Sequence, residues 1–179
     1  MLTSLKLFKP FLLIVGTREP RKNMKRMVEA WLEHRDMYDC VVIGAAGWDE
    51  LPHHQGLHIL GYLDAKELAS LYRSAVGLLF ASLYEGFGLP ILEAFFHGCP
   101  VATSRVSSMP EVAGEAAIYV NPFDVQDIAK ALHQILCNPT LRETLSHKAQ
   151  RNADRFSWKT AAEQTLAIFA EAIEIKHKC

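Results

Sequence analysis

The stretch VGLLFASLYEGFGLPILEAFFHGCPVATS, residues 76–104, decides the fold of this 179-residue chain. Two short apolar runs, 76–82 and 100–104, enclose a helical pattern over 88–98. A proline near the start of that helix and a glycine at its end suit those two positions. A strand, a helix and a second strand in this order predict two parallel strands joined by a crossover helix.

The same alternation continues through the rest of the chain. Further strands are expected at 10–16, 40–44, 57–61 and 116–120, and further helices at 21–35, 64–75, 123–137 and from 139 onward. This pattern predicts an α/β fold with a Rossmann-like, doubly wound parallel sheet. We expect a single domain over residues 11–179, including a C-terminal helix, and an N-terminal tail or linker remnant over residues 1–10.

Charge and cysteine content exclude several classes of protein. The net charge of −1 provides no general attraction for nucleic acid or for an anionic membrane, so any anion site must be local. No apolar run approaches the roughly 20 residues that a membrane-spanning helix needs. The four cysteines lack metal or redox spacing and indicate reduced cytosolic thiols. No nucleic-acid partner and no metal site are therefore expected.

Three loops are candidates for a ligand site. In doubly wound sheets, ligands bind beyond the carboxyl ends of the strands. The loops that leave those ends here are GTREPRKN (16–23), GAAGWDE (44–50) and SLYEGFG (82–88). Each is rich in glycine or in charge, and we expect the three to converge.

The third loop leads directly into a helix. Helix N-termini expose unpaired N–H groups, and the glycines of EGFGLP would let a phosphate approach them. Glu93 is expected in the first turn of that helix, where its carboxylate can accept hydrogen bonds from sugar hydroxyls. Two plainer interpretations stay open: Glu93 stabilises the helix dipole at the surface, and the glycines form a tight turn.

The first loop carries a group of cations, Arg18, Arg21 and Lys22. Arginine and lysine in such a loop suit a diphosphate. If the helix begins at Arg21, cations at its start oppose the helix dipole, and an anionic ligand would compensate. The alternative is a solvated, charged helix start.

Four blocks occur in an order that resembles a known family. They are VGTREPRKN (15–23), GYLDAKELASLYRSA (61–75), the segment 81–124 and RFSW (155–158). The most specific feature is the E-x7-E element formed by Glu85 and Glu93. The chain resembles the C-terminal, donor-binding domain of glycosyltransferase group 1 enzymes, which have the GT-B fold. The resemblance implies a single domain equal to the C-terminal half of such an enzyme.

The resemblance assigns roles to particular residues. Lys22 matches the lysine that contacts the donor diphosphate, Glu85 matches the glutamate near the transferred sugar, and these two are the expected catalytic residues. Glu93 matches the glutamate that binds ribose hydroxyls. The other residues expected at the donor are Gly16, Thr17, Arg21, Gly86, Phe87, Gly88 and Leu89.

Some assignments stay open. Thr17 stands where many members carry an arginine, so the second cation is Arg18 or Arg21, or is missing. Tyr62, which follows the third strand, is a candidate for contact with the nucleotide base. The segment Met109–Pro110–Glu111 resembles a loop near the donor, with a structural turn as the alternative.

The implied function is retaining, metal-independent transfer of a hexose from a GDP- or UDP-sugar to a glycan or lipid-linked acceptor, without a cofactor. The EPRKN variant resembles members that act on mannose. Two alternatives remain: a non-catalytic nucleotide-sugar-binding module and a fragment of a GT-B sugar-nucleotide epimerase. The expected location is the cytoplasm. A second possibility is that the full-length enzyme attaches peripherally to the inner membrane face.

The resemblance also implies a partner. Acceptor residues would lie in an N-terminal GT-B domain outside these 179 residues, so the chain alone is expected to lack transfer activity. The last helix carries an apolar stripe formed by Trp158, Ala162, Leu166, Phe169 and Ile173. We expect part of it to face water or to join a second copy in a homodimer. The alternative is packing on the domain's own sheet.

Overall fold

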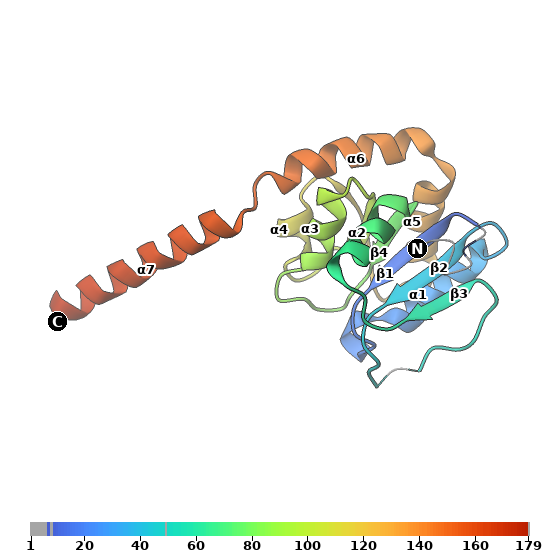
Figure 1. Ribbon diagram of the computed structural model, residues 1–179, viewed down its shortest axis with the longest axis horizontal. Coiled ribbons are helices and arrows are strands. Elements are labelled where there is room, and N and C mark those ends of the chain that lie inside the picture. The colour runs from blue at the N-terminus through green and yellow to red at the C-terminus, as the bar shows by residue number, and fades with distance from the viewer. Residues whose placement is uncertain (1–6, 8, 49, 179) are drawn as a thin grey trace.

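A parallel sheet forms the centre of the computed structural model, which describes residues 7, 9–48 and 50–178 (Figure 1). The described residues form six strands in the order β3-β2-β1-β4-β5-β6, and every pair is parallel. The strands are β1 Phe11–Val15, β2 Asp39–Ile43, β3 Leu57–Leu60, β4 Gly77–Phe80, β5 Val101–Ser104 and β6 Ala117–Val120. The predicted doubly wound parallel sheet is therefore confirmed. Most of the expected tail, residues 1–10, lies outside the described residues.

Helices cover both faces of this sheet. They are α1 Met24–Trp31, α2 Ala65–Ser74, α3 Leu89–Phe96, α4 Met109–Ala113, α5 Val125–Cys137, α6 Pro139–Ala153 and α7 Trp158–Lys178, with short 3-10 turns η1 Pro20–Lys22 and η2 Leu32–His34 on either side of α1. Successive side chains of a strand point to opposite faces. Leu12 and Ile14 accordingly pack with α1 and α5, whereas Phe11 and Leu13 pack with α2, α3 and α4.

Local signals set several helix ends. Asp64 accepts a hydrogen bond from the Glu67 amide, and the Glu67 carboxylate accepts one from the Asp64 amide. This reciprocal pair is a capping box, which an aspartate followed three residues later by a glutamate can form. Gly98, with φ of 67°, follows the end of α3 in the left-handed conformation that glycine adopts readily.

The predicted helix over 21–35 is wrong at its start. Asn23 has φ of 59° and separates η1 from α1, so Arg21 and Lys22 are not at the N-terminus of α1. Asparagine tolerates this conformation, and the buried Asn23 amide donates to Ala81 O at 2.9 Å and to Pro122 O at 2.7 Å. These long-range bonds outweigh the local preference for an uninterrupted helix. The dipole argument for an anionic ligand at Arg21 and Lys22 therefore fails.

The segment Met109–Pro110–Glu111 is also not a loop. It forms the first residues of α4, whose Met109 is buried between α3 and the sheet. The preceding loop contacts the candidate site described below, and Met109 Cγ lies 3.9 Å from where a Cβ at Gly88 would be.

Helix α7 extends away from the rest of the molecule (Figure 1). Trp158, at 82% exposure, and Leu166, Phe169 and Ile173 are all exposed on it. The alternative that this stripe packs on the domain's own sheet is wrong. Within the described residues, no helix is both long enough and apolar enough to cross a membrane.

The described cysteines carry free thiols. Cys40 and Cys99 are buried and Cys137 is exposed, while Cys179 lies outside the described residues. Burial raises the pKa of the Cys99 thiol to about 12 and raises that of Cys40 further. Both buried thiols therefore stay protonated, inert core residues at neutral pH.

Candidate functional site

The candidate site lies where the winding of the sheet changes direction. β1 and β4 are neighbours in the sheet, and the chain leaves their carboxyl ends through loops 16–23 and 81–88. Such a switch point leaves a crevice outside the sheet. The two loops meet directly, since the Leu83 amide donates to Arg21 O at 2.7 Å.

A buried ion pair joins these two loops. Lys22 Nζ lies 2.7 Å from Glu85 Oε1, and Arg21 Nη1 lies 3.2 Å from Glu85 Oε2. Lys22 is only 8% exposed and Glu85 only 7% exposed. Arg21 is more open and also contacts Glu19 through Nε at 2.9 Å. The structure thus brings together two cations and one glutamate from the predicted set.

The chain around Lys22 is built to bury its methylenes. Gly16 has φ of 151°, and a Cβ at that position would lie 3.3 Å from Lys22 Cδ. On another side, Lys22 Nζ lies 5.4 Å from the centroid of the Phe80 ring. Gly16 therefore makes room for the lysine stem, while the aromatic face stabilises the cation.

The loop after β2 completes the expected convergence. A Cβ at Gly44 would lie 2.0 Å from Gly16 O, and one at Gly47 would lie 2.1 Å from Arg18 O. The Arg18 amide also donates to Ala45 O at 3.3 Å. These two glycines are needed because the backbones approach closely. The prediction that the three loops lie together is confirmed.

The turn that follows Glu85 is open. A Cβ at Gly86 would meet no atom within 4 Å, so packing within the described residues does not require glycine there. The amides of Gly86 and Phe87 make no hydrogen bond within that part of the chain. Gly88 does have a backbone reason, because its φ is 103° at the start of α3. Phe87 and Leu89 flank this turn and are partly exposed.

Glu93 is not in the first turn of α3, because the helix begins at Leu89. Its carboxylate lies in the second turn and accepts a hydrogen bond from the Tyr72 hydroxyl at 2.8 Å. The Tyr72 ring in turn stacks on His97, with the ring centroids 5.9 Å apart. Burial and the Glu93 carboxylate raise the pKa of Tyr72, so the phenol remains a hydrogen-bond donor.

The remaining predicted residues differ in their placement. Thr17 is half-buried in the first loop, and the buried Nε of Arg18 has no hydrogen-bond partner among the described residues. Tyr62 is 91% exposed beyond β3 and contacts neither Lys22 nor Glu85 in the structure.

Sequence reasoning missed a fourth loop, which follows β5. The hydroxyls of Ser107 and Ser108 both donate to Glu85 O. Because β5 is the sheet neighbour of β4, a loop at its carboxyl end must lie beside the loop at 81–88. The available signals were the two serines three and four residues after a predicted strand and the resemblance of the next segment, Met109–Pro110–Glu111, to a loop near the donor.

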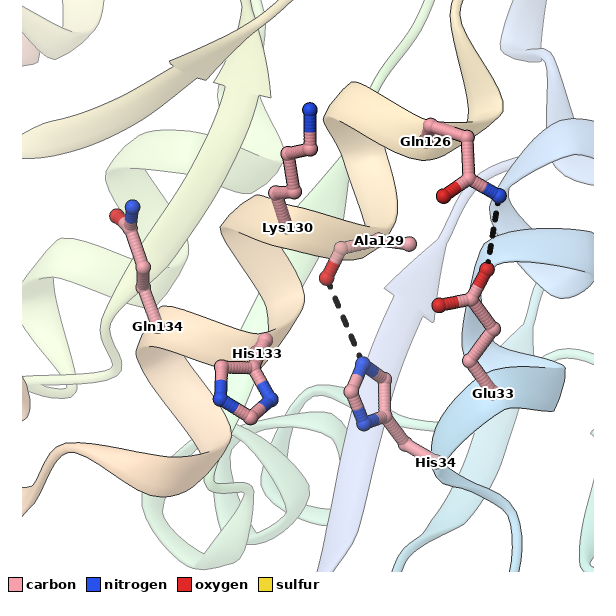
Figure 2. Close-up of a pocket in the computed structure, with 7 residues that line it drawn as sticks. All are labelled: Glu33, His34, Gln126, Ala129, Lys130, His133 and Gln134. Carbon is pink, nitrogen blue, oxygen red and sulfur yellow. Dashed lines mark hydrogen bonds between the residues drawn. The ribbon is translucent and has the colours of Figure 1, made fainter.

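A separate hollow lies away from this site, between η2 and α5 (Figure 2). It has a volume of about 350 Å³ and is lined by Glu33, His34, Gln126, Ala129, Lys130, His133 and Gln134. Polar bonds cross it: Gln126 Nε2 donates to Glu33 Oε1 at 2.9 Å, and His34 Nε2 lies 3.4 Å from Ala129 O (Figure 2). In the described part of the chain, no three histidine, cysteine or acidic side chains are arranged to hold a metal ion.

Comparison with known proteins gives a consistent result. The model of the family "Glycosyl transferases group 1" matches residues 9–138. The chain is 36% identical over 172 residues to "O-antigen chain mannosyltransferase B" of Escherichia coli, covering 89% of this chain and 45% of that protein. It thus spans about half the length of that relative.

Solved structures share the fold. The sucrose-phosphate synthase of Thermosynechococcus elongatus aligns with a TM-score of 0.81 at 23% identity, over 97% of this chain and 48% of that chain. The C-terminal domain of the group 1 family protein LpcC from Francisella tularensis aligns with a TM-score of 0.73 at 24% identity, over 86% of this chain and 89% of that one. The second comparison shows that a domain of this size and fold has been solved separately.

Proposed function

Because this chain belongs to the glycosyl transferases group 1 family, we propose that it is the donor-binding half of a retaining, metal-independent glycosyltransferase. The donor is a nucleoside diphosphate sugar, and the acceptor is a glycan or a lipid-linked glycan. An N-terminal domain of similar size supplies the acceptor side of the cleft. Support for this division is that the chain spans only 45% of its mannosyltransferase relative.

The buried Lys22–Glu85 pair beside the open Gly86 turn is the observation that carries this proposal. An ion pair alone is a common structural feature. Here it adjoins a glycine that packing within the described residues does not require. A ligand that fills the space beyond Gly86 would account for that glycine.

The proposed chemistry follows from where charge develops. The bond between the anomeric carbon and the diphosphate breaks, the acceptor hydroxyl oxygen bonds to that carbon on the same face, and the hydroxyl proton passes to the departing diphosphate. Negative charge then collects on the diphosphate, where Lys22 and Arg21 stabilise it. Preorganised charges of this kind contribute several kcal/mol, about 3 or 4 for a single well-placed donor. No metal is needed in this proposal, because the cations and the start of α3 take its place.

Glu85 acts on the opposite charge. As the bond breaks, positive charge develops on the sugar ring. The Glu85 carboxylate is held by Lys22 and Arg21 in the free chain. When the donor diphosphate takes over the contact with Lys22, the carboxylate can accept hydrogen bonds from the sugar hydroxyls. Glu93, further along α3, binds the ribose.

Mannose is the proposed sugar. The support is the E. coli relative named as a mannosyltransferase and the EPRKN loop of this chain. The cytoplasm is the proposed location, with peripheral attachment at the inner membrane face when the acceptor is lipid-linked.

Calorimetric titration tests the proposal. The folded chain is titrated with GDP, GDP-mannose, UDP and UDP-glucose in the presence of a chelator. We expect one nucleotide pair to bind, with an affinity that added Mg²⁺ leaves unchanged. Absence of heat with all four ligands contradicts the proposal, and binding that requires Mg²⁺ contradicts metal independence. Binding without transfer by the chain joined to its N-terminal half would favour a non-catalytic module.

A further inference from the structure

The loop after β5 forms hydrogen bonds with the backbone of residues 85–87, the glutamate turn. Ser107 Oγ donates to Glu85 O and accepts from the Glu85 amide, the latter at 3.2 Å. The single hydroxyl hydrogen of Ser108 is shared between Glu85 O, 3.0 Å from Oγ, and Phe87 O, 2.8 Å from Oγ. Two adjacent hydroxyls thus engage both backbone groups of Glu85 and the carbonyl two residues later. Gly86, the open residue of the turn, lies between the two contacted carbonyls.

Both serines depart from a more favourable local arrangement in making these contacts. Ser108 is the N-cap residue of α4, a position at which serine usually bonds an amide of its own helix. Its hydroxyl makes no such cap bond and instead reaches the glutamate turn. Ser107 has φ of 58°, a backbone conformation that costs energy for residues other than glycine. The strained backbone of Ser107 and the missing cap bond of Ser108 indicate that this loop conformation is retained for its contacts to the glutamate turn.

These contacts also provide a way to orient the Glu85 side chain toward a bound sugar. Its carboxylate is held from one side by Lys22 and Arg21, and its backbone is held from the other by the two hydroxyls. If the proposed donor draws Lys22 and Arg21 toward the diphosphate, the serine contacts to the Glu85 backbone remain. The orientation of the carboxylate toward the sugar then depends on them.

We propose that Ser107 and Ser108 are positioning residues that hold Glu85 and the Gly86 amide toward the sugar of the donor. This inference rests on the proposed function. It predicts that the hydroxyls affect recognition of the sugar more than recognition of the nucleoside diphosphate, because Lys22 and Arg21 lie in another loop.

The test compares two ligands that differ only in the sugar. GDP-mannose and GDP, and UDP-glucose and UDP, are titrated against the wild-type chain, S107G, S108A and the double variant. Glycine is chosen at 107 because it accepts the positive φ while removing the hydroxyl. S108T keeps a hydroxyl and serves as the conservative rescue, and Ser74→Ala, at the exposed end of α2, serves as the remote control.

We expect the double variant to bind the nucleotide sugar about tenfold more weakly and the free nucleotide within about twofold, as for the loss of one or two hydrogen bonds. S108T and S74A should stay close to wild type. Equal losses for both ligands, or no loss for either, would overturn the inference.

A second readout separates this inference from the proposed function. Amide hydrogen exchange at Glu85 reports local opening of the turn without any ligand, because this amide donates to Ser107 Oγ. In the double variant we expect exchange at the Glu85 amide to accelerate at least about tenfold, while exchange in β4 stays unchanged. Unchanged exchange at the Glu85 amide contradicts the positioning role of Ser107 and Ser108. A wild-type chain that binds no nucleotide contradicts the proposed function instead.

Discussion

Lys22 Nζ lies 2.7 Å from Glu85 Oε1, although sixty-three positions separate the two residues in the chain. Both side chains are buried. Removing a charge from water costs several kcal/mol, about as much as a well-formed buried pair returns. The pair is therefore weak evidence for stability and stronger evidence for a site in which one partner is exchanged for a ligand.

Replacing the lysine tests its role. Lys22→Ala should weaken binding of GDP by about 1.5–3 kcal/mol, because a charge-assisted contact to the diphosphate is lost. Binding of guanosine should change little. Calorimetry with both ligands measures this, and Lys130→Ala, an exposed lysine on α5, is the matched control. If Lys22→Ala weakens the binding of guanosine and of GDP equally, the assignment of Lys22 to the diphosphate is wrong.

The same substitution should lower stability. Without Lys22, Glu85 stays buried with only Arg21 as a charged partner. Breaking a buried ion pair from one side typically costs about 3–5 kcal/mol, and Arg21 should reduce that penalty. Urea unfolding of Lys22→Ala and of Lys22→Ala/Glu85→Ala measures the effect. The double variant should recover part of the lost stability, and a further additive loss would show that the two charges are not coupled.

Glu93 should govern ligands that carry a ribose. Glu93→Ala is expected to weaken the binding of guanosine and the binding of GDP by similar factors, in contrast to Lys22→Ala. Tyr72→Phe removes the hydroxyl that holds the Glu93 carboxylate and should give a smaller loss in the same pattern. Titration of both variants with both ligands provides the comparison. Tyr119→Phe controls for loss of a phenol elsewhere, since its hydroxyl donates to Gly114 O.

The two glycines of the turn should behave differently. Gly86→Ala adds a methyl group in open space, so the fold should tolerate it while donor binding is lost. Gly88→Ala should instead destabilise the protein by about 1 kcal/mol or more, because alanine is strained at φ of 103°. Thermal unfolding and titration separate the two effects. Gly61→Ala, also in open space but after β3, should alter neither, and normal donor binding by Gly86→Ala would contradict the site.

Helix α7 should be dispensable for folding. The described core clusters extend only as far as Phe156, and the α7 side chains through Ile173 are exposed. A chain that ends at Ser157 should therefore unfold at nearly the same urea concentration as the full chain. It should also show less self-association by light scattering if the apolar stripe joins two copies. A large loss of stability would mean that α7 packs on the domain in solution.

One histidine should leave a pH signature. Partial burial and the nearby Arg73 cation lower the pKa of His97, and the Glu93 carboxylate opposes this shift. The unfolded chain then binds more protons than the folded one below about pH 6.5, so this contribution to stability is lost as the pH falls through that window. His97→Gln should flatten the pH dependence of unfolding between about pH 5 and 7 relative to wild type. An unchanged slope would mean that His97 does not contribute.

Several features of this protein follow from the sequence by itself. The alternation of apolar runs with helical patterns predicts the parallel sheet, because burial on both faces imposes that composition on each strand. Lys22, Glu85 and the glycines follow predicted strands, and the carboxyl ends of parallel strands share one edge. Convergence of their loops was therefore predictable, and so was the capping box of Asp64 and Glu67, since it is purely local.

Only the tertiary structure decided the rest. Asn23 interrupts a helix that local preference would continue, because its amide bonds the carbonyls of Ala81 and Pro122 from two distant loops. The predicted crossover already puts the loop after β5 beside the loop at 81–88, but the contact of the Ser107 and Ser108 hydroxyls with the Glu85 backbone depends on loop angles such as the φ of 58° at Ser107. Periodicity records which side chains are buried, but the partner of each polar group depends on strand order and on backbone angles that no local pattern fixes.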